Sequence, residues 1–515
     1  MSIRAPAVLM RGINKRFGAV QANKEVTLSV SSGTVHGIVG ENGAGKSTLM
    51  SILYGFYQAD SGSIEIEGQP ANITRSKEAI ALGIGMVHQH FMLVDPLSAL
   101  DNIMLGAEPD WRLQAARAEV RAKLETLMHD TGLVVRLDTP VEDLPVGERQ
   151  RLEILKALYR GARILILDEP TAVLTPQETD QLFVTLRKLR ANGTTILLIT
   201  HKLKEILALC DKVTVMRAGA VVLDCPIAET SLDKLAEAMV GRRVNLGRDG
   251  GAAAKPGAPL LEAKHLQWHD ALGVIRLADV SLTLRAGEIV GIAGVSGNGQ
   301  SELLEALSGM LTPHGGELQL GAGHFTPKAW LDPARARALG LAHVPEDRHR
   351  VGLVLPFAAW ESAILGHQKL GRFAGRFGWM KQSAMQADTV RMMESYDVRP
   401  RNPQLRSSKF SGGNQQKLVL AREAIVKPKV LLVGQPTRGV DIGAIEFIHG
   451  QLRAMRDAGG AVLVVSSELD EILALSDRVL VMDRGRIAGE LPIDDCNEAA
   501  LGRLMCGASA SEQEQ

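Results

Sequence analysis

GENGAGKST, residues 40–48, is the stretch that decides the fold of this chain. An apolar, strand-like run at 35–39 precedes it, and residues 49–53 follow it as the first turns of a helix. Its glycines let the backbone curl so that successive N–H groups face an anion, and the helix start adds partial positive charge. The stretch therefore predicts a loop that binds a nucleoside triphosphate, with Lys46 on the β- and γ-phosphates and the Ser47 hydroxyl on Mg²⁺.

The composition limits the classes of protein that this chain fits. A chain of 515 residues is too long for a single core, so at least two domains are expected. Lys and Arg together number 58, as do Asp and Glu, and this balance gives no sign of a nucleic-acid partner. The four cysteines form no CxxC pair, which argues against a zinc site or a disulfide framework. The apolar runs are strand-sized, well below the ~20 residues of a membrane span, so we expect a soluble chain without a secretion signal.

The second half of the chain repeats the first. A second glycine loop, GVSGNGQSE at 294–302, also follows an apolar run, and the later landmarks recur in the same order. A stretch rich in glycine, alanine and proline separates the copies and is typical of a flexible linker. We therefore predict a first domain at 6–246, a linker at 247–259, a second domain at 260–506 and a flexible tail at 507–515.

Each copy alternates short strands with helices. In the first copy we expect helices at 115–130, 148–159 and 176–191 and strands at 164–167 and 194–199. This alternation is typical of an α/β fold with a mainly parallel core sheet. Ligands of such sheets bind at the carboxyl ends of the strands, where the loop at 40–48 falls.

Two strand ends of the first copy carry polar groups that are suited to metal binding and catalysis. An acid after the strand at 164–167, Asp168, can hold Mg²⁺ opposite Ser47, and the next one, Glu169, can polarise an attacking water. His201 follows the neighbouring strand and would reach the γ-phosphate. Taken singly, such an acid pair is usually a solvated strand end and such a histidine a loop residue. Their place beside a phosphate loop favours the functional interpretation.

A family resemblance rests on these pieces taken together. The phosphate loop, His88-Gln89, ILILDEPT at 164–171 and ITHKL at 199–203 resemble the ABC ATPases, over roughly 8–246 and 260–505. The resemblance implies two tandem P-loop domains, each with a mainly parallel core sheet, an antiparallel β part and a helical subdomain. In that family each ATP lies between the phosphate loop of one domain and the signature loop (consensus LSGGQ) of the other. The signature loops here are LPVGE at 144–148 and FSGGN at 410–414.

The resemblance implies a set of site residues, which we expect to be shared between the two halves. Glu169, His201 and Gln89 are expected to be catalytic, and Mg²⁺ is expected at Ser47, Gln89 and Asp168. Phe17 lies where family members stack an aromatic ring on adenine, although a phenylalanine of a strand core is an equal alternative. Contacts with ATP are expected from Phe17, from Gly40, Glu41, Asn42, Gly43, Ala44, Gly45, Lys46, Ser47 and Thr48, and from Ser411, Gly412, Gly413 and Asn414.

The second half departs from the family pattern at its own phosphate loop. The loop lysine is replaced by Gln300 and followed by Ser301-Glu302, the acid pair is replaced by Gly434-Gln435, and the histidine by Ser467. Glu346 stands where Gln89 stands, and Pro145 removes the serine of the first signature loop. When the phosphate loop of each half is paired with the signature loop of the other half, one site stays close to consensus. Every element of the other site then departs from the consensus. We expect one hydrolytic site and one non-hydrolytic site; the alternative is a second site that binds ATP weakly and still turns it over.

The apolar segment FMLVDPLSALDNIML, residues 91–105, is open to two interpretations. It suits a groove for the helix of a membrane partner, and it also suits the core of the helical subdomain. Phe357 and Trp360 present the same choice in the second half.

Within the family, the most specific resemblance is to tandem ATPases of bacterial importers for simple sugars and nucleosides, the nucleoside branch above all. It rests on MVHQHFMLV at 86–94, TAVLTPQE at 171–178 and PTRGVD at 436–441. It implies two integral-membrane permease subunits, an indirect substrate-binding protein, no nucleic acid, and a peripheral place on the cytoplasmic face of the bacterial inner membrane. The alternative is a soluble tandem ABC ATPase that acts on ribosomes or in regulation.

Overall fold

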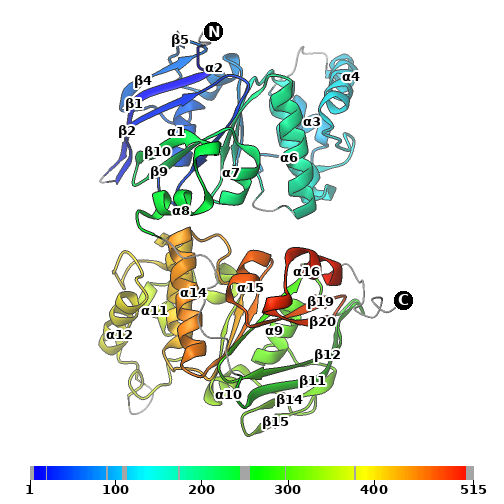
Figure 1. Ribbon diagram of the computed structural model, residues 1–515, viewed down its shortest axis with the longest axis vertical. Coiled ribbons are helices and arrows are strands. Elements are labelled where there is room, and N and C mark those ends of the chain that lie inside the picture. The colour runs from blue at the N-terminus through cyan, green and yellow to red at the C-terminus, as the bar shows by residue number, and fades with distance from the viewer. Residues whose placement is uncertain are drawn as a thin grey trace. The chain divides into compact units, whose positions relative to one another are not determined.

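The computed structural model describes residues 5–18, 20–88, 91–106, 113–171, 174, 176–243, 256–295, 297–375 and 379–505. The chain divides into two compact units, Met1–Val244 (unit one) and Asn245–Gln515 (unit two) (Figure 1). The expected tail at 507–515 and all of the expected linker but 256–259 lie outside the described residues. Over the described chain, no helix is both long and apolar enough to cross a bilayer.

Unit one is built on a six-stranded sheet in the order β10-β9-β3-β8-β7-β6. Its strands pair in parallel except for β10, which is antiparallel to β9. Every residue of the inner strands β3, β7 and β8 and of the edge strand β6 is buried, because helices and a second sheet cover both faces. The strands are β3 Val35–Val39, β6 Ile84–Val87, β7 Ile164–Asp168, β8 Thr195–Ile199, β9 Lys212–Arg217 and β10 Ala220–Pro226.

A four-stranded antiparallel sheet and two groups of helices complete unit one. The sheet has the order β2-β1-β4-β5, from β1 Val8–Phe17, β2 Val20–Val30, β4 Ser61–Ile66 and β5 Gln69–Pro70. Figure 1 shows α3, α4 and α6 at the opposite side of the unit from this sheet. The helices are α1 Lys46–Leu53, α2 Ser76–Ala81, α3 Ala99–Met104, α4 Leu113–Thr131, α5 Val146–Tyr159, α6 Pro176–Ala191, α7 Leu203–Leu209 and α8 Leu232–Val240. Short 3₁₀ turns lie at Val141–Asp143 (η1) and Ile227–Glu229 (η2).

Unit two repeats this architecture. Its six-stranded sheet has the order β16-β17-β18-β13-β19-β20 and its antiparallel sheet the order β12-β11-β14-β15. The strands are β11 Pro259–His269, β12 Ile275–Arg285, β13 Glu288–Gly294, β14 Gly315–Leu320, β15 Gly323–Phe325, β16 Leu341–Val344, β17 Val430–Gly434, β18 Ala461–Val465, β19 Arg478–Asp483 and β20 Arg486–Pro492.

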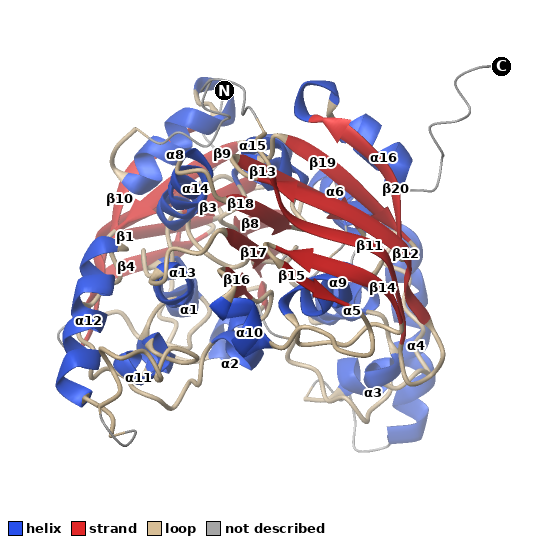
Figure 2. Ribbon diagram, turned by 90° about the horizontal axis from the view of Figure 1, so that it is seen from below, coloured by secondary structure: helices blue, strands red, loops and turns tan. Residues whose placement is uncertain are grey.

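Two helices of unit two, α11 and α12, lie on the opposite side from β11, β12 and β14 in both views (Figures 1 and 2), whereas α9 packs against β12. The helices of the unit are α9 Gln300–Ser308, α10 Pro333–Ala338, α11 Ala359–Ala363, α12 Gln382–Ser395, α13 Gly412–Ala424, α14 Ile442–Asp457, α15 Leu469–Leu475 and α16 Glu498–Met505. A π-helical turn, η3, spans Arg348–Gly352, and 3₁₀ turns lie at Ser407–Lys409 (η5) and Ile493–Asp495 (η6).

The predicted fold class is confirmed, with a mainly parallel core sheet, an antiparallel sheet and helices in each unit. Two helices begin earlier than expected, and the first of them, expected at 115–130, spans Leu113–Thr131. The helix expected at 148–159 starts at Val146, because Pro145 stands at its N-cap, where a residue without an N–H leaves no donor unpaired.

Close packing at Gly37 gives a test of the sheet–helix layer of unit one. A Cβ at this position of β3 would lie 2.7 Å from Ile206 Cδ1 and 3.1 Å from Cys210 Sγ, on and just after α7. We expect Gly37→Ala to force α7 off the sheet, to cost ~1–3 kcal/mol and to lower the thermal unfolding midpoint. Gly450→Ala is the control, because its Cβ would meet open space in α14 and alanine favours a helix. Equal midpoints for the two variants would contradict this packing.

Candidate active site

The backbone of the first glycine loop is shaped by close contact with β2. Gly45 has a left-handed φ of 97° at the N-cap of α1. A Cβ there would lie 2.2 Å from the carbonyl oxygen of Ala22, so no other residue fits. The Asn23 side-chain amide donates a hydrogen bond to the Gly45 carbonyl at 3.1 Å. The loop is therefore held open in front of α1 by the neighbouring sheet.

The Lys46 side chain points into this loop. Its Nζ donates to the carbonyl oxygens of Gly40 at 2.6 Å and Glu41 at 3.0 Å, and the residue is only 6% exposed. The ammonium group thus lies inside the curl of the backbone, where an anion bound by the loop would meet it. This placement fits the phosphates of ATP, because both the charge and the surrounding N–H groups favour an anion.

Ser47 and Asp168 face each other across the end of the sheet. The Ser47 hydroxyl is hydrogen-bonded to the Asp168 carboxylate, which is 8% exposed. Burial raises the pKa of Asp168 above its usual value and Glu169 adds to this rise, while the bonds and charges of Ser47 and Lys46 oppose it. A buried carboxylate beside a hydroxyl is the kind of oxygen pair that hard cations prefer, and a bound cation would relieve the cost of its negative charge. These residues therefore fit Mg²⁺.

Glu169 and His201 form the second pair of the site. His201 Nδ1 lies 2.9 Å from Glu169 Oε1, with side-chain exposures of 25% and 13%. The hydrogen bond from His201 lowers the pKa of Glu169 below its usual value, so the carboxylate stays ionised at neutral pH. Glu169 has a left-handed φ of 49°, and its N–H donates to the Ile199 carbonyl at 2.8 Å. This strained conformation is held by the hydrogen bond to the neighbouring strand.

Other predicted residues lie at the edges of the site or beyond the described chain. Phe17 is 42% exposed at the end of β1, where its ring meets Tyr57 edge-on at 5.1 Å between centroids. It is therefore not a residue of the strand core, and its contact with adenine stays a prediction. Gln89 lies outside the described residues. In the segment 91–105, Leu100 and Ile103 are fully buried in the core of the helical subdomain, while Met92 is 61% exposed and its part in a partner groove stays a prediction.

The two signature loops differ at the start of the helices that follow them. Ser411 is the N-cap of α13, and its hydroxyl accepts from the Asn414 N–H at 3.5 Å and from the Asn414 side-chain amide at 2.8 Å. Pro145 takes the same place before α5 and offers no side-chain cap. Only the second signature loop therefore presents a hydroxyl together with the N–H groups of a helix start.

The second phosphate loop holds neutral or acidic groups where the first holds a cation. Gln300 is 6% exposed and its Nε2 donates to the Val295 carbonyl at 3.0 Å. Gln435 Oε1 accepts from the N–H and hydroxyl of Ser467 at 3.2 and 3.1 Å, a neutral counterpart of the Glu169–His201 pair. These are the replacements expected from the sequence.

One contact of the second loop was not predicted. The Ser301 hydroxyl donates to Glu346 Oε2 at 2.5 Å, from the end of the neighbouring strand β16. A Cβ at Gly434 would lie 2.3 Å from Glu346 Cγ, so the glycine makes room for this side chain. Glu346 is thus hydrogen-bonded to Ser301 as Asp168 is to Ser47 in unit one. The signal in the sequence was the joint change to Gly434 and Glu346.

The chain is similar over nearly its whole length to known proteins. The ABC transporter family profile matches residues 23–172 and 277–438. A nucleoside import ATP-binding protein of Lactococcus lactis is 42% identical over 98% of this chain and 99% of its own length. A ribose import ATP-binding protein of Chromobacterium violaceum is 38% identical over 98% and 99%. A crystal structure of an archaeal ribosome recycling factor with a ribosomal stalk protein has a TM-score of 0.64 at 18% identity, over 96% of this chain and 92% of that one, which shows the shared fold alone.

Glu169→Gln tests the assignment of the base. The amide keeps the shape of the side chain but cannot accept a proton from water, so we expect single-turnover ATP hydrolysis to fall by about 100-fold or more with nucleotide binding retained. Gln435→Glu, the reverse change in unit two, is the matched control and is expected to leave the rate unchanged, because Gln300 and Gly434 remain. Hydrolysis near the wild-type rate in Glu169→Gln would refute the assignment.

His201→Ala tests the electrostatic role of the histidine. The hydrogen bond from His201 holds the pKa of Glu169 low, so its loss raises that pKa, and the carboxylate form is then lost at a higher pH. We expect the acid limb of the kcat–pH profile to move to higher pH. His129→Ala, at the exposed end of α4, should leave the profile in place. A uniform loss of rate with an unmoved acid limb would contradict this role.

Proposed function

Because this chain belongs to the ABC transporter family and is an ATP-binding ABC-type ATPase, we propose that it is the ATP-hydrolysing subunit of an importer that takes up a nucleoside. The observation that carries the proposal is the contrast between the two phosphate loops, one with a complete set of polar groups and one with neutral replacements. The nucleoside assignment is supported by the 42% identity to a nucleoside import subunit, above the 38% to a ribose import subunit.

In this proposal each polar group of unit one has one role. Lys46 and the loop N–H groups hold the β- and γ-phosphates. Ser47 and Asp168 would hold Mg²⁺ together with Gln89, which the family resemblance adds, and the ion would draw charge from the phosphates. Glu169 accepts a proton from the attacking water, and His201 keeps this carboxylate ionised and oriented.

The same proposal assigns the second half of the ATP site to Ser411–Asn414 of unit two. The capped start of α13 suits the far side of a γ-phosphate, because its hydroxyl and N–H groups are donors. The sorting of intact and altered residues supports this pairing, since the intact phosphate loop and the intact signature loop lie in different units. The altered loop at 294–302 and Pro145 then fall together in a non-hydrolytic site.

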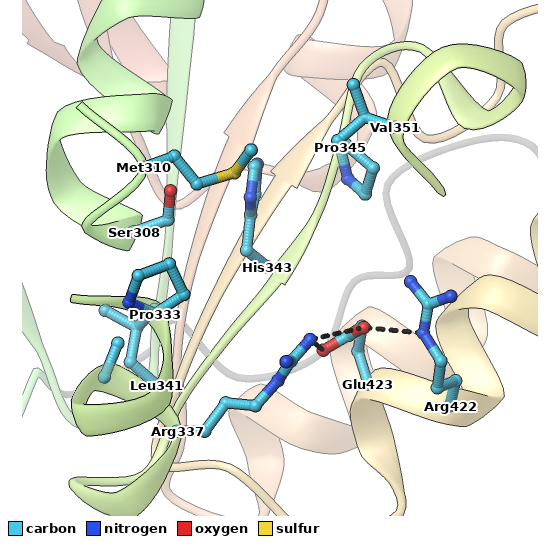
Figure 3. A pocket seen from close by; sticks show the side chains of 11 residues that line it. Ser308, Met310, Pro333, Arg337, Leu341, His343, Pro345, Val351, Arg422 and Glu423 are labelled. Atoms are coloured by element: carbon cyan, nitrogen blue, oxygen red, sulfur yellow. Dashed lines mark hydrogen bonds and ion pairs between the residues drawn. The ribbon is translucent and has the colours of Figure 1, made fainter. Parts of the chain in front are cut away.

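Unit two contains a cavity. It has a volume of about 220 Å³ and opens between the end of α9, α10, β16 and α13 (Figure 3). The His343 ring and the Met310 side chain face it, and Arg337 pairs with the buried Glu423 at its floor at 3.3 Å. His343 Nε2 is buried and has no hydrogen-bond partner among the described residues. Phe357 and Trp360, for which a groove for a membrane partner is one interpretation, do not line it.

Co-purification tests the transport assignment against the ribosomal or regulatory alternative. We expect the chain, extracted from detergent-solubilised membranes, to carry two polytopic membrane proteins, and the reconstituted complex to take up a nucleoside when ATP is supplied. Lys46→Ala should abolish both ATP turnover and uptake while the complex still assembles, because only the phosphate site loses its cation. Recovery with ribosomes and without membrane proteins, or full turnover in Lys46→Ala, would overturn the proposal.

A further inference from the structure

The segment 346–352, called here the strap, connects the altered phosphate loop of unit two to its signature helix. At one end, Glu346 accepts from the Ser301 hydroxyl at 2.5 Å. At the other end, the Gly352 carbonyl accepts from Arg422 Nη1 on α13 at 2.6 Å. Both ends are therefore tied to elements that are distant in the sequence.

The middle of the strap is also held. Asp347 caps the π-helical turn η3, because its carboxylate accepts from the N–H groups of His349 and Arg350 at 2.9 and 3.0 Å. His349 Nε2 lies 2.8 Å from Gln415 Oε1, one turn into α13. The first residue of η3, Arg348, is thus presented to the start of α13 by a segment with little freedom.

The Arg348 guanidinium reaches the backbone of the signature loop. Its Nη1 donates to the Arg438 carbonyl at 2.6 Å, in the turn that follows β17. Its Nη2 lies 2.8 Å from the point where a Cβ of Gly412 would stand, and 3.4 Å from that of Gly439. A side chain at Gly412 would push against the guanidinium and, also at 2.8 Å, against the Gly439 carbonyl oxygen, so the glycine leaves room for both groups.

Unit one has neither an arginine nor a glycine at the corresponding positions. Val146 stands at the position of Gly412, and its side chain is 40% exposed. The residue two places after Gln89 is Phe91, whereas Arg348 stands two places after Glu346. The arginine that contacts the first signature loop is instead Arg149 of α5, which donates to the Leu144 carbonyl at 2.9 Å, so the place of Arg348 is particular to unit two.

The guanidinium is costly to keep at this place, which argues for a role. Burial lowers the pKa of Arg348 from its usual value, and the positive charge of Arg438 lowers it further. Its Nε is buried and has no hydrogen-bond partner in the described part of the chain. An arginine stays charged nonetheless, so the contact with the loop costs stability that a smaller residue would not.

We propose that Arg348 is a positioning residue that holds the signature loop Ser411–Asn414 in the shape that receives the γ-phosphate of ATP. It acts through the Arg438 carbonyl and the backbone at Gly412, and it touches no phosphate itself. This inference rests on the proposed function, in which that loop completes the ATP site of unit one. The altered phosphate loop anchors the strap through Ser301 and so contributes to hydrolysis without binding the hydrolysed nucleotide.

Steady-state ATP hydrolysis by the chain assembled with its permeases tests the proposal. We expect Arg348→Ala to lower kcat by about tenfold or more and to leave KM for ATP within about twofold, because the phosphate loop of unit one is untouched. The kcat of Arg348→Lys should fall between those of the wild type and Arg348→Ala, since lysine keeps a donor group but not the planar guanidinium with its several N–H groups. Arg350→Ala is the matched control on the same turn and should behave as wild type.

A double-mutant cycle distinguishes positioning from general destabilisation. Gly412→Ala should lower kcat in the wild-type chain and less so in the Arg348→Ala chain, because the guanidinium that the new methyl group meets is then gone while the Gly439 carbonyl oxygen remains. Additive effects of the two changes would overturn the proposal. If Arg348→Ala does not accumulate as folded protein, Arg348→Lys decides, and a wild-type kcat in that variant would also overturn it.

Ser411→Ala separates this inference from the proposed function. If Ser411→Ala abolishes turnover and Arg348→Ala does not lower kcat, the positioning role is wrong and the proposed function stands. If neither change affects turnover, the signature loop has no part in hydrolysis and the proposed function itself fails.

Discussion

The register of one parallel sheet brings the polar groups of unit one together. Ile38 of β3, Ile199 of β8 and Asp168 of β7 stand on the same rung, because Ile38 pairs with Ile199 and Ile199 with Asp168. The residues that follow this rung on each strand are the glycine loop, Glu169 and His201. Parts of the chain far apart in the sequence therefore meet at the carboxyl edge of the sheet. The pairing of the strands brings them together, and no contact between their side chains is needed.

Unit two has the same rung, but neutral residues replace most of the charged and titratable groups that lie at or after it. Ile292, Val465 and Gly434 pair across β13, β18 and β17. Gln435 keeps the left-handed φ of 47° and donates its N–H to the Val465 carbonyl at 2.7 Å, as Glu169 does to its neighbour. The strained backbone is thus a property of the shared scaffold, and the side chain on it decides whether the site can hydrolyse ATP.

Local patterns in the sequence predicted the fold and most of the site because the strands and loops that form them are continuous. The buried run at 164–168 and the loop at 40–48 each carry their own signal of strand, turn and helix. The Ser301–Glu346 contact was not predicted, because it depends on room left by Gly434 on a neighbouring strand. The place of Arg348 was missed for the same reason: no local pattern shows which loop backbone lies within reach of a side chain.

Unit two has Gln300 and Gln435 where unit one has a lysine and a glutamate, yet other features of the shared fold are retained in it. Its signature loop carries the serine cap that Pro145 removes from unit one. The strap behind that loop is tied to Ser301, the one polar group of the altered phosphate loop that matches the first. Replacement of the acid at Gly434 removed a carboxylate and at the same time opened the space through which Glu346 reaches this serine. The proposed loss of hydrolysis at one loop and the proposed support of the signature loop can therefore follow from the same pair of changes.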